Sequence, residues 1–469
     1  MYLTWLIGYL VAIISVGYFF SKKVKNADDY TLAGSSLGFF PICGTIMATA
    51  TGSFAIIATS GRGFTTGLSF LSWNIGYVLF GILAALLLSS AIRALKLHTI
   101  PELFKRRFGK WTALLPALTI GLMFLVPLFA VQLVGMGSVI ASTFGIKFEL
   151  AVLIGFTLCV GFTLAGGMFS VAYTDALQML IILFGIILLF VLTIQQLGGV
   201  AEAFNNSSPE IINPFSISFG DWLSLLLIFG TLSFVYQTTW QRIAAAKSRK
   251  TAVRAVTAGF SVVFIMTILT VCIGVFARQL IPLETMPDMV YSTLMTKVMP
   301  PKIAGLFVVT LFSAILTSAT SFLLSGATSI ARDIYVDWIN PKTKKEPSLK
   351  ILRLATIFMA IIGLFIALYV KDIWTITIYA KAVSASILFF PVLAAFFWKQ
   401  ATSIGVISSM LIAAFVAILW QSYGNPLATN AVIPGMTVNL LTLVIVSLLT
   451  NHSSDEDPVA YYFEYRNQF

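Results

Sequence analysis

The 469-residue chain is 58% hydrophobic and 10% charged, with a mean hydropathy of +0.95. So little polar surface cannot cover a soluble globule, which excludes a soluble enzyme or binding protein and indicates an integral membrane protein in a lipid bilayer. In a soluble protein, a net charge of +11 would suggest binding to nucleic acid. The distribution of the basic residues along this chain is better explained by membrane topology, so no nucleic-acid partner is expected.

Apolar runs of about 17 residues or more, bounded by charged or turn residues, predict thirteen membrane-spanning helices. No charge precedes the first run and three lysines follow it, which is typical of a reverse anchor and not of a cleaved signal. The runs lie near residues 2–20, 37–59, 67–92, 112–141, 149–168, 176–197, 220–241, 252–279, 302–330, 351–370, 373–397, 401–420 and 433–450.

The basic residues predict the orientation. Alternate threading of thirteen spans places 22 of the 29 Lys and Arg on one side, at residues 22–25, 93–110, 242–254, 332–353, 399 and 466. Because positive loops stay inside, we expect a multi-pass protein of the plasma membrane with its N-terminus outside and its C-terminus in the cytoplasm.

Two spans carry weak helix formers at mid-depth. One contains Thr49, Thr51, Gly52 and Ser53, and the other contains Gly230, Thr231 and Ser233. Each span begins a block of five, and interrupted helices at matching places in two halves are typical of inverted-repeat transporters. The alternative is that these small residues only let helices pack closely.

The paired blocks predict an all-α membrane protein with six segments. These are a leading helix and loop (1–36), a first five-helix repeat (37–197), an extracellular loop (198–219), a second repeat (220–397), two further helices (398–450) and a cytoplasmic tail (451–469).

A hydroxyl stripe marks the span near residues 302–330. Ser313, Thr317, Thr320, Ser321 and Ser325 recur at spacings of three and four, so a helix places them on one face. Hydroxyls and freed backbone carbonyls can replace the water around a monovalent cation. The alternative is ordinary packing between membrane helices.

Several long motifs resemble the sodium:solute symporter family, which includes bacterial proline, pantothenate, sialic acid and galactose carriers and the human sodium-glucose cotransporters. They are HTIPELFKRRFG (98–109), LAGGMFSVAYTDALQ (164–178), WQRIAAAKSRKTA (240–252), PPKIAGLFVVTLFSAILTSATSFLLSGATSIARDIY (300–335) and FFPVLAAFFWK (389–399). The resemblance covers nearly all of the chain. It implies a LeuT-type inverted five-helix repeat with one helix before it and two after it.

The resemblance also implies the ion sites. The main sodium site would take backbone carbonyls from Ala48, Thr51 and Ala314 and hydroxyls from Thr317 and Ser318. Some family members have a second sodium site, whose matching residues here are Asp175, Thr317, Thr320 and Ser321. An alternative for Asp175 is a helix-start carboxylate at the cytoplasmic face.

The solute cavity is expected between the two breaks and the tenth core helix. Its candidate residues are Gly52, Ser53, Phe54, Ala55, Trp73, Asn74, Thr231, Ser233, Phe234, Gln237 and Lys381. Lys381 lies about 13 Å past the charged entrance of its span at Asp372, where a cation is costly unless it faces a wet cavity and an anion. It could instead extend towards the surface or pair with Asp372.

The resemblance places Lys381 where the sugar carriers have a substrate-contacting Gln, which argues for a solute with a carboxylate, an organic anion or zwitterion, over a neutral sugar. The proline carriers have an Asp in the first break where Ala50 stands, which argues against proline. Short segments at 131–137 and 286–305 favour the pantothenate carriers weakly. The solute, its ratio to sodium and the oligomeric state stay open.

These features together predict sodium-coupled import of a small solute by alternating access. The alternatives are a carrier of a neutral sugar, a transporter-like sensor without significant flux, and a channel, which broken helices suit less well. An enzyme is not expected, because His98 and His452 both lie in flanking segments and no nucleophile and base occur together.

Overall fold

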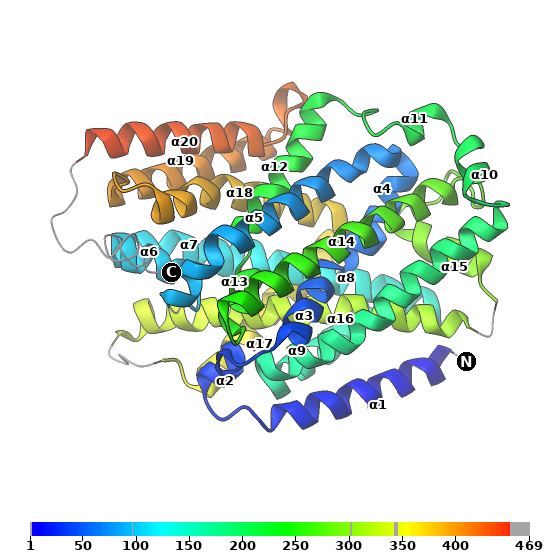
Figure 1. The fold of residues 1–469 in the computed structure, drawn as a ribbon, viewed down its shortest axis with the longest axis horizontal. Helices are drawn as coiled ribbons and strands as arrows, with labels where there is room; N and C mark the ends of the chain where they lie inside the picture. Colours follow the sequence, from blue (N-terminus) through cyan, green and yellow to red (C-terminus); the bar gives the residue numbers. More distant parts are fainter. Residues whose placement is uncertain (1, 96, 301–302, 342–345, 451–469) are drawn as a thin grey trace.

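The computed structural model describes residues 2–95, 97–300, 303–341 and 346–450, so the tail expected at 451–469 lies outside it. Long helices lie side by side along one direction (Figure 1), and within the described residues there is no strand. An isolated β-bridge between Leu37 and Ala246 is the nearest approach to sheet structure in that part of the chain.

The first half of the chain contains the peripheral helix α1 and the first set of core helices. Their bounds are α1 (Tyr2–Ser21), α2 (Ala27–Leu32), α3 (Phe39–Ala50), α4 (Thr59–Thr66), α5 (Ser72–Ala94), α6 (Ile100–Phe108), α7 (Lys110–Leu118), α8 (Leu125–Phe144) and α9 (Phe148–Gln196), with short turns η2 (Phe54–Ala58), η3 (Gly67–Leu71) and η4 (Thr119–Phe124) between them.

The second half repeats this layout and adds two helices. Its elements are α10 (Val200–Asn205), α11 (Pro209–Ile212), α12 (Phe219–Val235), α13 (Gln237–Ala245), α14 (Arg249–Ala277), η5 (Pro287–Met289), α15 (Val290–Val298), α16 (Ala304–Ser329), η6 (Ile330–Ile339), α17 (Leu349–Val370), α18 (Ile373–Phe397), α19 (Ser403–Ser422) and α20 (Val432–Leu449).

Eleven helices within the described residues are long and apolar enough to cross a membrane. The expected spans 149–168 and 176–197 both fall inside the 49-residue α9, and the expected spans 37–59 and 67–92 share one long run that begins at Phe54, after the shorter α3. The number thirteen therefore stays a prediction, although every expected span coincides with helix.

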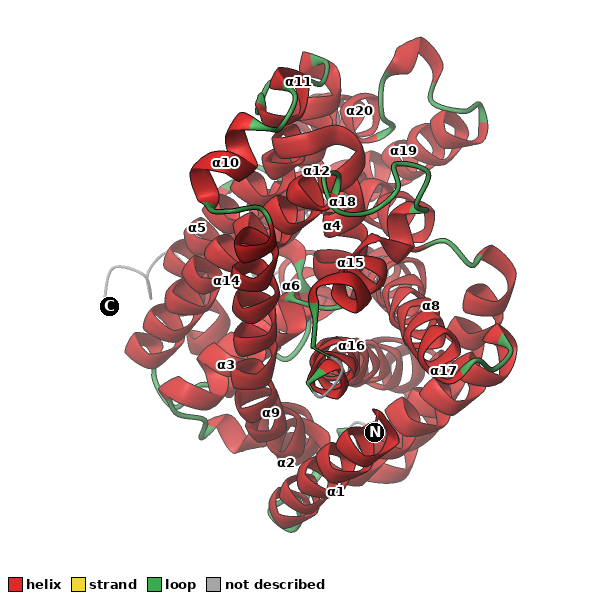
Figure 2. Ribbon diagram, turned by 90° about the vertical axis from the view of Figure 1, so that its right-hand side faces the viewer, coloured by secondary structure: helices red, strands yellow, loops and turns green. Residues whose placement is uncertain are grey.

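The most buried long helix is α16, which packs against α3, α8 and α9 and lies inside the bundle (Figure 2). Its hydroxyl stripe is fully enclosed, since Ser313, Thr317, Ser321 and Ser325 are all buried. By contrast α1, α19 and α20 lie at the periphery and expose many large apolar side chains, as expected for surfaces that contact lipid.

The first predicted break is confirmed. Helix α3 ends at Ala50, Thr51 leaves helical geometry at φ −104° and ψ 39°, and a π-helical turn begins at Phe54. Weak helix formers that can bond locally therefore mark the place where the backbone opens.

The second break was predicted around Gly230, Thr231 and Ser233, and that position is wrong. These residues are helical in α12, and the chain breaks at Tyr236, with φ −79° and ψ 100°. The hydroxyls of Thr231 and Ser233 donate to their own helix at the carbonyls of Leu227 (2.6 Å) and Phe229 (3.3 Å), which is compatible with helix.

The two broken helices are connected at one end of the bundle. The Leu37 N–H donates to the Ala245 carbonyl at 3.0 Å, and the Lys247 N–H donates to the Leu37 carbonyl at 2.8 Å. The start of α3 and the end of α13 are thus held together by backbone hydrogen bonds.

Gly167 makes the sharp turn inside α9. Its backbone has φ +52° and ψ −154°, and a Cβ there would lie 2.6 Å from the Tyr30 carbonyl oxygen. Only glycine tolerates both the conformation and the close approach.

We expect Gly167→Ala to cost about 1–3 kcal/mol in backbone strain alone, and more from the clash with Tyr30. The matched control is Gly161→Ala on the same helix, where a Cβ meets no atom within 4 Å. Melting temperatures of the purified proteins should fall clearly for Gly167→Ala and stay level or rise for Gly161→Ala; equal values would contradict the assignment.

Candidate functional site: an ion site and a solute cavity at the helix breaks

Four of the five residues predicted for the main sodium site meet where α3 opens. The Ala48 carbonyl accepts from the hydroxyls of Thr317 (3.1 Å) and Ser318 (3.3 Å), and the Ala314 carbonyl accepts from Thr317 at 3.0 Å. Thr51 caps the same helix end, with its N–H directed at the Ala48 carbonyl at 3.3 Å. These neutral oxygens, gathered around one backbone carbonyl, fit a monovalent cation.

Gln132 on α8 holds the other side of the break. Its Oε1 accepts from the Ser53 N–H at 2.9 Å and from the Ser53 hydroxyl at 3.0 Å, and its Nε2 donates to the Leu128 carbonyl at 3.3 Å. The sequence analysis did not select Gln132. Its position could have indicated a functional role, because it is a polar side chain within an apolar span, and such residues are often functional.

A small cavity lies beside these oxygens. Its volume is about 30 Å³, which is enough for one or two water molecules and far too small for an organic solute. Of the residues predicted for the solute cavity, Gly52, Phe54, Ala55, Trp73 and Lys381 line it, and Ser53 contacts the lining residue Gln132. The sequence analysis missed the lining residues Tyr77, Tyr236 and Phe322.

Five other candidates do not line this cavity. Asn74 donates to the Phe264 carbonyl at 3.2 Å, and Ser233 donates to the Tyr77 carbonyl at 2.9 Å. Gln237 bonds to the His98 carbonyl (3.1 Å) and the Ile100 N–H (3.0 Å), in the segment before α6. The remaining two are Thr231, which bonds within α12, and Phe234, whose ring packs against Phe80 and Phe389.

Lys381 is only 7% exposed and points into the cavity. Its Nζ lies 4.2 Å from the ring centre of Phe229 and 4.9 Å from that of Phe54. Pairing with Asp372 and extension to the surface are both wrong, because the Asp372 carboxylate instead caps the start of α18 at the N–H groups of Trp374 (3.2 Å) and Thr375 (3.1 Å).

Aromatic side chains close the cavity towards the end of the bundle that carries α10, α11 and α15. Phe54 stacks on Trp374 with ring centres 6.1 Å apart, and the Arg62 guanidinium lies 3.9 Å from the Trp374 ring centre. In η5, burial and the nearby Asp372 carboxylate raise the pKa of Asp288 to about 6, against the opposing effect of Arg62.

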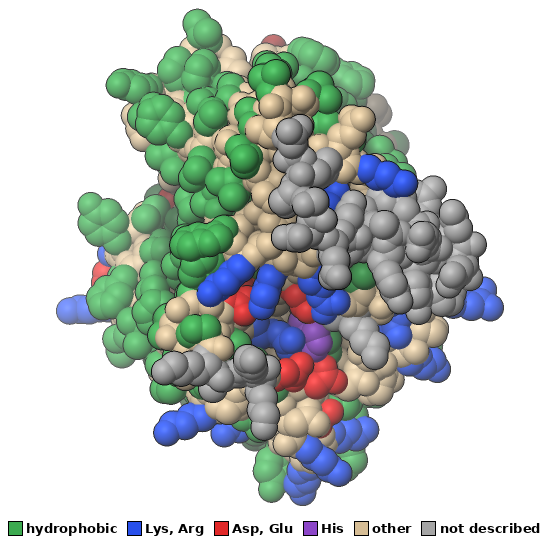
Figure 3. Space-filling view, turned by 90° about the vertical axis from the view of Figure 1, so that its left-hand side faces the viewer, with side chains coloured by type: hydrophobic (Ala, Val, Ile, Leu, Met, Phe, Trp, Pro, Cys, Tyr) green, Lys and Arg blue, Asp and Glu red, His purple; other side chains and the backbone are tan. Residues whose placement is uncertain are grey.

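The other end of the bundle, called here the basic end, is polar. Figure 3 shows its Lys and Arg side chains gathered around acidic groups and a histidine. A cavity of about 590 Å³ opens there, lined by Glu102, Lys105, Lys110, Arg332, Asp333, Asp337 and Glu346. It lies away from the helix breaks, so size alone does not identify the solute site.

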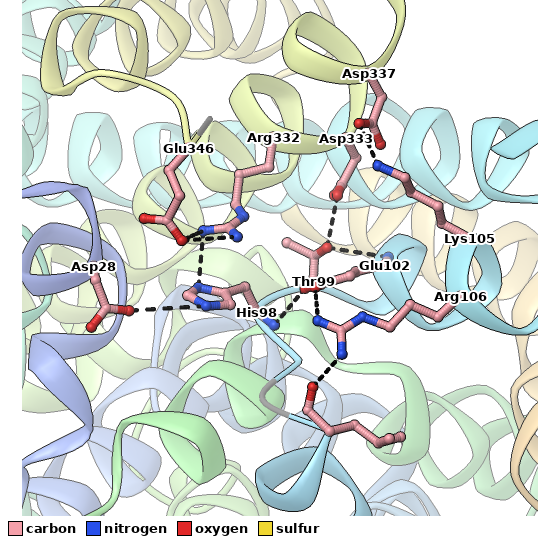
Figure 4. Close-up of polar contacts among 11 residues, drawn as sticks. Asp28, His98, Thr99, Glu102, Lys105, Arg106, Arg332, Asp333, Asp337 and Glu346 are labelled. Carbon is pink, nitrogen blue, oxygen red and sulfur yellow. Dashed lines mark hydrogen bonds and ion pairs between the residues drawn. The ribbon is translucent and has the colours of Figure 1, made fainter. Parts of the chain in front are cut away.

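Charged and polar contacts join three parts of the chain at the basic end (Figure 4). Thr99, just before α6, donates to Asp333 of η6 at 2.7 Å, and Lys105 pairs with Asp337 at 2.7 Å. His98 contacts Arg332 at 3.0 Å and Asp28 at 3.9 Å. Burial and the Arg332 charge lower the pKa of His98, so its ring is neutral at pH 7 and its contact with Asp28 is not an ion pair there.

The residues expected for a second sodium site are partly together. The Thr320 hydroxyl bonds within its own helix, to the carbonyls of Leu316 (3.0 Å) and Thr317 (3.1 Å). Asp175 and Ser321 belong instead to one buried network with Thr45, Thr49 and Arg242. The basic cluster 242–254, expected on the cytoplasmic side, includes Arg242, and the side chain of this residue is fully buried.

The model of the sodium:solute symporter family matches residues 30–413, most of the chain. The chain belongs to the sodium:solute symporter family. It is accordingly a membrane transporter that couples the movement of a small solute to sodium, and the family consists of transporters, not enzymes.

Full-length relatives agree with this assignment. The chain is 27% identical to a sodium/pantothenate symporter of Haemophilus influenzae, with 94% of each chain covered. It is 26% identical to the osmoregulated proline transporter OpuE of Bacillus subtilis (94% of this chain, 93% of that one) and 25% identical to a sodium/glucose cotransporter of Vibrio parahaemolyticus (96% and 90%).

Solved structures confirm the LeuT-type fold of this symporter family member. A sodium-coupled sialic acid symporter in a substrate-bound outward-open state superposes with a TM-score of 0.85 at 22% identity, covering 97% of this chain and 99% of that one. The nucleobase-cation symporter Mhp1 in a closed conformation superposes with a TM-score of 0.62 at 13% identity, covering 91% and 96%.

Gln132 provides a test of the break geometry. We expect Gln132→Leu to leave the Ser53 N–H buried without a partner, which costs about 1–3 kcal/mol, and to weaken sodium binding because the neighbouring carbonyls lose their support. Ser53→Ala is the control, since it removes the hydroxyl and keeps the backbone bond. Sodium-dependent thermal shifts should shrink strongly for the first variant and little for the second; a full shift in Gln132→Leu would contradict this role.

Proposed function

We propose that the protein imports a small organic solute that carries a carboxylate, together with sodium, by alternating access between the two ends of the bundle. The basic end would face the cytoplasm, with the N-terminus outside and the C-terminus inside, because positive loops stay on the cytoplasmic side of bacterial membranes.

The observation that carries the solute class is Lys381. A lysine at the centre of a membrane costs about 2.5–3.5 kcal/mol, and two aromatic faces return about 0.5–2 kcal/mol each. The rings of Phe54 and Phe229 can thus hold the ammonium at the cavity, while a carboxylate would add a charge-assisted hydrogen bond. Proline, pantothenate and sialic acid, named for three similar proteins, all carry a carboxylate.

We propose Ala48, Thr51, Ala314, Thr317 and Ser318 as the sodium ligands. Their hydroxyls are buried and now donate to the freed Ala48 carbonyl, so rotation of two side chains would direct their lone pairs at an ion. An ion there would connect α3 to α16 and fix the shape of the break. Since Gly52 lines the cavity and packs against Ser318, ion binding would also prepare the solute site.

The closed cavity supports alternating access. Trp374, Arg62 and Phe54 cover it on one side, and the contacts of Gln237 and Asp333 with the segment before α6 close the path to the basic end. A solute could enter only after one of these closures opens, which is the behaviour of a carrier and not of a channel.

Sodium dependence can be tested on α16. We expect Thr317→Ala combined with Ser318→Ala to lower sodium affinity at least tenfold, about 1.4 kcal/mol, while the helix persists because alanine is a good helix former. Thr328→Ala is the control, because its hydroxyl bonds only within the helix, to the Leu324 carbonyl at 2.7 Å. Unchanged sodium dependence of uptake in proteoliposomes would contradict the ligand assignment.

The solute class can be tested first with purified protein. Thermal shifts with and without sodium, against monocarboxylates, pantothenate, amino acids, sialic acids and sugars, should select compounds with a carboxylate. With such a solute, we expect Lys381→Gln to weaken binding by at least about 30-fold, because losing one partner of a buried charge pair costs about 2–5 kcal/mol.

Lys381→Arg is the matched control because it keeps the charge, and sodium binding should persist in both variants. Normal transport of the acid by Lys381→Gln, or selection of a neutral sugar by the wild type, would refute the proposed solute class.

A further inference from the structure

The cavity beside the first break contains one charged group and no counter-ion for it. Among the described residues of its lining, Lys381 is the only charged side chain, and there is no carboxylate. An ammonium has three donors and no acceptor. On the same helix, the Asp372 carboxylate is occupied by backbone N–H groups at the start of α18. A solute with a positive charge would therefore meet a like charge in this cavity and no acidic partner.

Two further polar groups of the lining have no partner. The indole Nε1 of Trp73 and the hydroxyl of Thr377 belong to residues that are 2% and 0% exposed, and neither makes a hydrogen bond within the described residues. Native proteins leave few buried polar groups unpaired, so two of them at one cavity indicate a ligand that pairs with both. An indole N–H can only donate, whereas a hydroxyl can donate or accept.

The hydroxyl of Thr377 is free to reach a ligand because it is not used by its own helix. Ser386, also on α18, donates to the Ala382 carbonyl four residues earlier at 2.8 Å, and Thr377 makes no such bond. Thr377 precedes Lys381 by four residues, so the helix places both on one face. A hydroxyl and an ammonium side by side suit the two oxygens of one carboxylate.

Trp73 lies against the same aromatic rings as the ammonium. Its ring centre is 5.5 Å from that of Phe54 and 4.9 Å from that of Phe229, the two rings over which the Lys381 Nζ lies. The indole N–H and the ammonium therefore flank one apolar wall. They can contact different atoms of one small solute, the ammonium its carboxylate and the indole a neutral acceptor oxygen.

The acceptors near the two breaks are already in use. Gln132 Oε1 accepts both the N–H and the hydroxyl of Ser53. At the second break, the Phe234 carbonyl accepts from Trp240 Nε1 at 2.8 Å, and the Tyr236 carbonyl accepts from the Trp240 N–H at 3.2 Å. An ammonium group on the solute would have to compete with these donors, whereas a solute that offers only acceptors would not.

We propose that the solute is an organic anion without an amino group, whose carboxylate is bound by Lys381 and Thr377 and whose second, neutral acceptor oxygen is bound by the Trp73 N–H. Hydroxy acids and oxo acids fit this description, and amino acids do not. The assignment rests on the proposed function, in which Lys381 pairs with a carboxylate. It makes Trp73 and Thr377 the residues that determine specificity within that class.

The wild-type protein can be tested with acids that differ at one carbon. Purified full-length protein in saturating sodium is titrated by calorimetry with the 2-hydroxy, 2-oxo, unsubstituted and 2-amino acids of three skeletons, those of alanine, valine and phenylalanine. On the skeleton that binds best, we expect the hydroxy or oxo acid to bind at least about tenfold more tightly than the unsubstituted acid, and the amino acid to bind most weakly.

Two variants then separate the contacts. Trp73→Phe keeps an aromatic ring and removes the N–H, so the hydroxy or oxo acid should lose its advantage while the unsubstituted acid binds as before. Thr377→Val keeps the shape and removes the hydroxyl, so all the acids should bind about tenfold more weakly. Ser386→Ala is the matched control, because its hydroxyl bonds only within α18.

Each contrary outcome has a distinct meaning. Tighter binding of an amino acid than of its unsubstituted acid would overturn this inference and leave the carboxylate requirement of the proposed function intact. An equal loss for both acids in Trp73→Phe would reduce Trp73 to a packing role and overturn its assignment. Binding of none of the twelve acids would overturn the inference, and selection of a neutral sugar would overturn the proposed solute class as well.

Discussion

The backbone that opens after Ala50 is the constraint on which the rest of this structure depends. A membrane offers no water to backbone groups that leave a helix, and each one left without a partner costs several kcal/mol. Here the freed groups are satisfied by side chains of neighbouring helices. The hydroxyls of Thr317 and Ser318 donate to the Ala48 carbonyl, and Gln132 Oε1 accepts from the Ser53 N–H. The requirement explains why α16 is both the most enclosed long helix and the one rich in hydroxyls.

Close packing against the break also determines the shape of the cavity. Small residues let α16 and α8 approach the break, and a Cβ on Gly52 would meet both Ser318 and Gln132 at 2.5 Å. Next to Gly52, the large rings of Phe54, Trp73 and Phe229 pack against one another. Thr51, one of the proposed ion ligands, is consequently followed directly in the chain by Gly52, which lines the cavity.

The sequence predicted the helical fold and the residues of α3 and α16 that meet at the first break, because those depend on local pattern. Each of the patterns used can be recognised within a segment of about twenty residues: the apolar runs, the hydroxyl stripe and the cluster from Thr51 to Ser53. It placed the second break three residues or more too early, because Thr231 and Ser233 can bond within their own helix as readily as outside it. It missed Gln132 and the burial of Arg242, since their roles come from contacts with helices distant in sequence.

The β-bridge at Leu37 has a mechanical consequence. Because the N–H and the carbonyl of Leu37 both bond to the backbone that leaves α13, the basic-end halves of the two broken helices are joined, although Leu37 and Ala245 lie 208 residues apart in the chain. A rotation of α3 alone would have to break these two backbone hydrogen bonds, so they couple the movement of α3 at this end to that of α13.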